Sequence, residues 1–115
     1  MTTRNLATNT QIALIAVVRK GAGERPECIT IAAALSTFQR QVGGHIQRRW
    51  IREPHIGFYY NPDSDLPANI RLDDGTIIHG AVIAFALDAR FGDERGLAPR
   101  ESTSVSRWLE THAPK

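Results

Sequence analysis

Cysteine and long hydrophobic runs are scarce in this sequence, and each shortage excludes a class of protein. The 115 residues include one cysteine, Cys28, so no disulfide bond can form within the chain. This usage fits a reducing compartment, and we expect the protein to be cytoplasmic. No run of about 18 or more apolar residues occurs, so we expect neither a membrane-spanning helix nor a membrane partner.

The motifs of common catalytic and cofactor sites are also missing. There is no G-x-S-x-G nucleophile elbow, and Cys28 has no histidine near it in the sequence. The four histidines lack the spacing of a zinc site, and residues 63–65 begin like a calcium loop without its later Gly and Glu. Residues 21–23, GAG, are too short for a dinucleotide fingerprint. We therefore expect no enzyme, no metal and no cofactor, and we expect Cys28 to be a small buried hydrophobic residue.

Lysine is rare in this sequence, and arginine supplies twelve of the fourteen basic residues. This bias has two explanations, which the sequence leaves open. Arginine offers forked donors for phosphate or carboxylate, and a GC-rich genome also favours arginine codons. The formal net charge of +2 is too small to establish a nucleic-acid partner. Hydrophobic residues at 42% and charged residues at 23% are ordinary for a globular domain.

The first half of the chain predicts a hairpin and a helix. Residues 1–10 are polar and without periodicity, which predicts a disordered tail before a single domain over 11–112. Residues 11–19 are almost continuously aliphatic, as in a strand covered on both faces, and 27–31 predict its hairpin partner. Apolar residues then recur at helical spacing, predicting a helix capped by Thr30 and ended by Gly43. Its stripe consists of Ile31, Leu35, Phe38 and Val42.

The second half predicts three further strands and a terminal helix. Residues 45–51 predict a strand near a sheet edge, and 55–60 its hairpin partner, followed by a long loop over 61–74. Residues 76–87 predict one central strand beside 12–18, with one face small enough for close approach of a helix. Residues 100–112 predict a C-terminal helix. The fold class is therefore α+β, with a mixed or antiparallel sheet of about five strands, one packing helix and a C-terminal helix.

Arginine and aromatic residues are concentrated between Arg40 and Tyr60. Such a surface can hold phosphates and stack bases, and the same residue types dominate the hot spots of protein interfaces. It can equally be a solvated arginine face over a core that contains Trp50 and Phe58. If the segment is functional, the residues expected to bind a partner are Arg40, Arg48, Arg49, Trp50, Arg52, Tyr59, Asn61 and Asn69.

The order of short motifs resembles an uncharacterised domain-of-unknown-function family of short phage, plasmid and actinobacterial proteins. Its members place a helix before a VGG-x-I segment, then an Asn-bearing loop with LP-x-N, then a D-x-I-x-G strand and a short terminal helix. Here those landmarks are residues 42–46 (VGGHI), Asn61 with 66–69 (LPAN), and 74–80 (DGTIIHG). The Arg-rich segment after Ile46 and the connection over 88–99 depart from the family pattern.

The resemblance implies a mobile-element setting and no known activity. The leading hypothesis is a non-enzymatic binding protein that inhibits a host or defence component by protein–protein contact, as anti-CRISPR and anti-restriction proteins do. The positive net charge argues against mimicry of DNA. The alternatives are a pocket protein that sequesters a nucleotide and a small nucleic-acid-binding domain.

Overall fold

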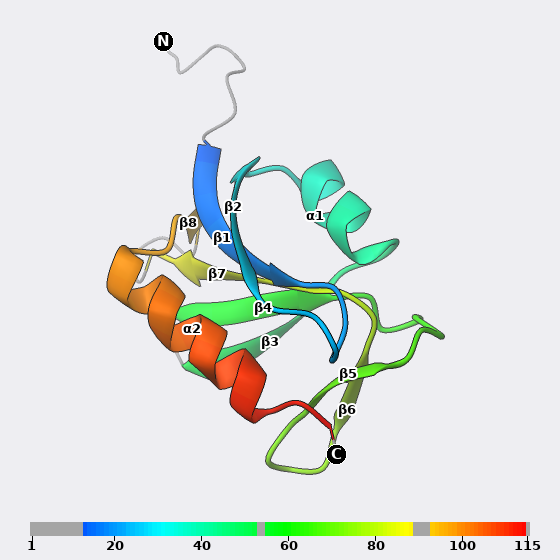
Figure 1. Cartoon of the computed structure of the whole chain (residues 1–115). Coiled ribbons are helices and arrows are strands. Elements are labelled where there is room, and N and C mark those ends of the chain that lie inside the picture. Colours follow the sequence, from blue (N-terminus) through cyan, green and yellow to red (C-terminus); the bar gives the residue numbers. More distant parts are fainter. Residues whose placement is uncertain (1–12, 53–54, 89–92, 115) are drawn as a thin grey trace, which may run out of the picture.

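The structure is a computed structural model that describes residues 13–52, 55–88 and 93–114. The tail predicted for residues 1–10 lies outside these ranges. The described elements are β1 (Ala13–Arg19), β2 (Glu27–Ala32), α1 (Leu35–Val42), β3 (Gln47–Arg52), β4 (Ile56–Tyr60), β5 (Ala68–Arg71), β6 (Ile77–His79), β7 (Val82–Leu87), β8 (Glu94–Arg95) and α2 (Pro99–Thr111) (Figure 1).

The main sheet is antiparallel and has the strand order β2-β1-β7-β4-β3, with the short β8 added beside β7. β5 and β6 form a separate two-stranded hairpin, which Figure 1 shows below the main sheet. The fold is α+β, as predicted, and β7 lies beside β1 at the centre of the sheet. None of the helices in the described ranges is long and apolar enough to cross a bilayer.

The two helices cover opposite faces of the main sheet. On one face, Val105 and Leu109 of α2 belong to one buried cluster with Ala84 and Ala86 of β7. On the other, Phe38 of α1 lies 5.9 Å from Phe85, measured between ring centroids. The alanine side chains leave room for close approach of a helix, so the prediction that the small face of this strand meets a helix is confirmed.

β1 and β2 form the predicted hairpin through an uninterrupted antiparallel ladder. β1 is buried on both faces only from Ala16 onward, because the side chain of Ile15 is 43% exposed. Cys28 is exposed, so its prediction as a buried residue is wrong. Its side chain lies on the face that carries α2, but at an outer strand that the helix does not cover.

Helix α1 is shorter than the periodicity predicted. Ile31 pairs with Leu14 in the β1–β2 ladder, so the main chain there is extended, and the helix begins at Leu35 instead of after Thr30. Leu35 is 58% exposed, whereas Phe38 and Val42 are buried. The predicted end of this helix at Gly43 is confirmed.

Gly43 occupies the left-handed region at φ 81° and donates its N–H to the carbonyl oxygen of Gln39. This conformation strains any residue with a Cβ, which explains the glycine at the end of α1.

The predicted strand over residues 76–87 is two strands in two different sheets. The chain turns at Gly80, where φ is +78°. A Cβ at this position would lie 2.6 Å from Oγ of Ser64, so only glycine fits. Before the turn, Ile78 is buried and pairs with Ile70 of β5. The loop predicted over 61–74 therefore contains a strand.

Candidate functional site

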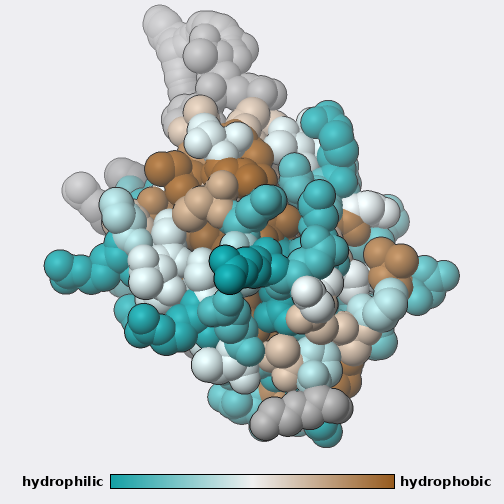
Figure 2. Space-filling model, in the orientation of Figure 1, coloured by the Kyte–Doolittle hydropathy of each residue, from teal (hydrophilic) through white to brown (hydrophobic). Residues whose placement is uncertain are grey.

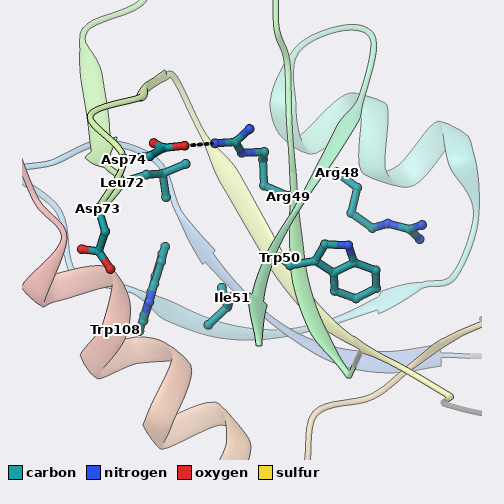
Figure 3. A pocket seen from close by; sticks show the side chains of 8 residues that line it. All are labelled: Arg48, Arg49, Trp50, Ile51, Leu72, Asp73, Asp74 and Trp108. Carbon is teal, nitrogen blue, oxygen red and sulfur yellow. Dashed lines mark hydrogen bonds and ion pairs between the residues drawn. The ribbon is translucent and has the colours of Figure 1, made fainter. Parts of the chain in front are cut away.

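A hollow of about 440 Å³ lies where β3, the β5–β6 turn and α2 meet. Figure 3 shows the side chains that surround it, contributed by residues 48–51, residues 72–74 and Trp108. The hollow combines two arginines, two aspartates and two tryptophans. Its lining residues are Arg48, Arg49, Trp50, Ile51, Leu72, Asp73, Asp74 and Trp108.

The pairing of β3 with β4 decides which side chains reach each face of the sheet. Directly opposed residues in an antiparallel pair point to the same face. Arg49 opposes Phe58 and therefore lies on the α2 face, whereas Arg48 opposes Tyr59 on the α1 face. Because β3 ends the sheet, its other edge borders the hollow.

Arg49 connects β3 to the β5–β6 turn. Its Nη2 lies 3.2 Å from Oδ2 of Asp74 and donates more weakly to Oγ1 of Thr76 at 3.4 Å. The pKa of Asp74 lies below its ordinary value, first because Thr76 donates its N–H to this carboxylate and also because Arg49 is close. Asp74 is therefore ionised at neutral pH and forms an ion pair with Arg49.

Arg48 and Trp50 form the opposite wall. The guanidinium carbon of Arg48 lies 4.9 Å from the centroid of the Trp50 ring, within cation–π range. Trp50 is partly buried against the α1-side cluster, while Arg48 is exposed. In Figure 3, Arg48 points away from Arg49 and from the acidic turn.

The remaining wall is the last part of α2. Trp108 packs against Phe58 at 6.0 Å and stacks on His112 at 4.1 Å between ring centroids. His112 in turn lies 3.3 Å from Asp73, so the β5–β6 turn and the helix end are connected beside the hollow. Trp108 thus lies between Phe58 and His112 and still lines the hollow.

The structure brings together three of the eight residues predicted to bind a partner, namely Arg48, Arg49 and Trp50. Arg40 is exposed on α1, and Arg52 is exposed at the end of β3. Asn61 supports its own loop, because its Oδ1 accepts the N–H of Asp63 at 2.9 Å. These last three residues do not line the hollow.

Tyr59 was expected on the partner surface, but the structure buries it. It is 7% exposed, its ring stacks on Phe85 at 4.3 Å, and its hydroxyl donates to Oε2 of Glu94 at 2.5 Å. Burial and the carboxylate of Glu94 raise its pKa above the ordinary value. In β4, a tyrosine on the α1 face points into the core because β3 and β7 flank it on both sides.

Asn69 is also buried, with no exposed surface. Its Nδ2 donates to the carbonyl oxygens of Arg19 at 2.9 Å and Gly80 at 2.8 Å. The side chain therefore joins the small hairpin to the main sheet, and Asn69 cannot contact a partner in this conformation. Its prediction as a surface residue was wrong because residues 68–71 are a strand instead of a loop.

Five of the eight residues that line the hollow were not predicted from the sequence as partner-binding residues. Trp108 lies in the predicted C-terminal helix over 100–112, Asp73 in the predicted loop over 61–74, and Asp74 at the start of the DGTIIHG motif. No local signal connects them with β3, since the turn and helix reach it only through the tertiary fold. Within the described ranges, no group of three or more His, Cys, Asp or Glu side chains is placed to hold a metal ion.

Comparison with protein-family models, with curated proteins and with solved structures found no match. The family resemblance drawn from the short motifs therefore stays a prediction.

Proposed function

We propose that this chain is a non-enzymatic binding protein that holds a partner protein at the hollow beside β3. The observation that carries the proposal is that Arg49 of β3 and Trp108 of α2 line one concave site at the edge of the sheet, with Arg48 and Trp50 on the side of the site that belongs to the α1 face. Tryptophan and arginine in desolvated pockets contribute most of the binding energy in many protein interfaces. Two carboxylates in the same hollow add sites for basic or amide groups of the partner.

The same carboxylates disfavour the nucleotide and nucleic-acid alternatives. A phosphate placed near Arg49 would also approach Asp74, whose ionised carboxylate already accepts the guanidinium. Asp73 adds a second negative charge to the same wall. The two carboxylates would repel a phosphate bound in the hollow, so the hollow suits a protein surface with both signs of charge better than a polyphosphate.

An inhibitor of a host or defence component would use such a site by occupying the surface that its target needs. The mobile-element setting is supported by the resemblance to short mobile-element proteins and is independent of the residues of the hollow. The positive net charge of +2 favours a target surface that is acidic or neutral around the contact.

The test begins with affinity capture from host lysate and continues with measured binding of the captured partner. We expect the double variant Arg48→Ala and Arg49→Ala to raise the dissociation constant roughly tenfold or more, mainly through faster dissociation. The matched control is Arg100→Ala with Arg107→Ala, which removes the same charge from exposed positions of α2. Circular dichroism would verify that both variants stay folded.

The salt dependence of binding separates the alternatives. A protein partner held by desolvated contacts should show modest salt dependence, whereas a nucleic acid should show a steep slope that flattens by about one unit for each lost phosphate contact. Equal binding by the folded hollow variant and by wild type would show that the arginines are a solvated face, and the proposal would be withdrawn.

A further inference from the structure

The two outer strands of the main sheet differ in how their edges are protected. β3 carries Arg48, Arg49 and Arg52, and its register with β4 shifts between Trp50 and Arg52, as at a β-bulge. Charges and bulges of this kind prevent a second strand from pairing with an edge. β2 has no β-bulge, because its ladder with β1 is regular over six pairs, and Glu27 is its one charged residue.

β2 is also rich in residues that favour strands. Its sequence, ECITIA, contains no proline and no glycine. Among the described residues it pairs with β1 alone, so the outward-facing main-chain N–H and C=O groups of this strand meet no other strand. A regular and nearly uncharged edge is a template for one more strand.

The face beside this edge is incompletely covered. Cys28 and Thr30 are exposed, and Ile15, which pairs with Thr30, is 43% exposed. Figure 2 shows hydrophobic surface over this part of the sheet, between the first strands and the start of α2. A hollow of about 410 Å³ lies there, lined by Ile15, Cys28, Ile29, Thr30, Leu97, Pro99, Ser102 and Thr103.

We propose that a second copy of this chain pairs with β2, strand to strand and antiparallel, so that the two sheets become one sheet across a two-fold axis. Closed two-fold dimers are the commonest oligomers of soluble proteins. The new ladder would satisfy the outward main-chain groups of both strands. It would also extend the apolar floor of the hollow with Cys28 and Thr30 of the second copy.

The charges of β2 do not oppose a second copy as the occupant. A two-fold axis perpendicular to the sheet keeps each face of the combined sheet continuous from one copy to the other. With such an axis, five residues of β2 pair with β2 of the second copy when the axis lies at Ile29 or at Thr30. In these registers the two copies of Glu27 are at least about 14 Å apart, at 3.4 Å per residue. This exceeds the screening length of about 8 Å at physiological salt.

The same operation on β3 is unfavourable. Antiparallel self-pairing of that strand places arginines opposite one another, for example Arg48 opposite Arg52 or Arg49 opposite itself. Like charges directly opposed across strands destabilise a sheet. Self-association is therefore specific to β2, and the hollow beside β3 stays available for a different partner.

Sedimentation equilibrium tests the dimer directly. We expect wild type to show a concentration-dependent mass that approaches twice 12.7 kDa. Thr30→Lys places two lysines at the seam and should raise the dimer dissociation constant roughly tenfold or more. The matched control Ser104→Lys adds the same charge at an exposed position of α2 and should dimerise like wild type. Because Thr30 is exposed, we expect both variants to fold.

The single cysteine supplies a second measurement. In the registers above, the Cα atoms of the two copies of Cys28 lie between about 8 and 15 Å apart on one face, from 3.4 Å per residue and 4.8 Å between strands. A nitroxide on Cys28 should therefore show dipolar broadening in its EPR spectrum. Dilution with unlabelled protein should remove that broadening.

Four outcomes would overturn the proposal. Wild type that is monomeric at every concentration would show that this edge has another occupant or none. A dimer that Thr30→Lys does not weaken, or that gives no broadening at Cys28, would have its seam elsewhere. A dimer lost in the double variant Arg48→Ala and Arg49→Ala would use the β3 hollow. The result does not depend on the partner proposed for that hollow.

Discussion

The guanidinium of Arg19 donates a hydrogen bond to the main-chain carbonyl of Leu109, which lies 90 positions further along the chain. Arg19 is 2% exposed and also donates to the carbonyl oxygens of Gly21 and Ala22, at 3.0 and 2.7 Å. Burial lowers the pKa of this guanidinium, and Glu110 opposes the shift. Leu109 stands in the last turn of α2, whose carbonyls form the negative end of the helix dipole. One side chain thus joins β1, the first turn and the last helix.

Replacement of Arg19 by Met should therefore destabilise the protein strongly. Met fills a similar volume but leaves three carbonyl groups without their donor, and we expect a loss of about 3 kcal/mol or more in the free energy of unfolding. Urea denaturation measures this loss. Arg107→Met, at an exposed site of α2, is the control and should change stability by less than about 0.5 kcal/mol. An equal effect of both variants would contradict the role of Arg19.

Phe38 should carry most of the contact between α1 and the sheet. It is 2% exposed and touches Tyr59 and Phe85, with ring centroids 4.9 and 5.9 Å away. We expect Phe38→Ala to cost about 3–5 kcal/mol, measured by thermal or chemical denaturation. Leu35→Ala in the same helix should cost far less, because Leu35 is 58% exposed. If the two variants have the same melting temperature, the buried face of α1 has been assigned wrongly.

Glu101 should make part of the stability depend on acidic pH. Its carboxylate accepts two hydrogen bonds from Arg95, at 2.9 and 3.0 Å, and the N–H of Ala98 at 2.9 Å. The bonds from Arg95, with help from Ala98, lower its pKa from 4.5 to about 2. The folded state therefore favours the ionised form, and this stability is present above pH 4.5 and is lost as the pH falls toward 2.

Unfolding measured for wild type and Glu101→Gln between about pH 7 and pH 2 tests this assignment. The difference in unfolding free energy should be largest at neutral pH and should shrink on acidification. Arg95→Met should flatten the profile in the same way, because it removes the main cause of the shift. Parallel profiles of wild type and Glu101→Gln would refute the assignment.

Tyr59 predicts the opposite dependence at high pH. Its raised pKa means that the folded state keeps the phenol protonated where the unfolded chain loses the proton. Its contribution is therefore complete below about pH 10 and is lost as the pH rises further. The unfolding free energy of wild type should fall more steeply above about pH 10 than that of Tyr59→Phe. Identical slopes for the two proteins would show that the phenol titrates freely.

The residues that sequence analysis placed correctly follow local rules. The aliphatic run of β1, the hairpin of β3 and β4 and the C-terminal helix α2 each result from short-range geometry. Gly43 ends α1 because only a residue without a Cβ tolerates its backbone angles easily. The alanines of β7 predicted a closely packed helix, since small side chains on one face leave space for it.

Tertiary structure decided the positions where two local preferences compete. Thr30 and Ile31 suit the start of a helix, yet pairing with β1 keeps them extended and moves the first turn of α1 to Leu35. The apolar residues around Gly80 suit one long strand, but the turn there sends the chain into a second sheet.

Burial of polar residues was likewise decided by contacts distant in sequence. Arg19 and Asn69 resemble surface residues until β1, the small hairpin and α2 surround them with carbonyl groups. The hollow beside β3 arises in the same way. Its arginines stand out in the sequence, but Asp74 and Trp108 reach them only when the chain has folded. Composition and periodicity report the immediate neighbours of a residue, and these sites depend on partners that only the fold supplies.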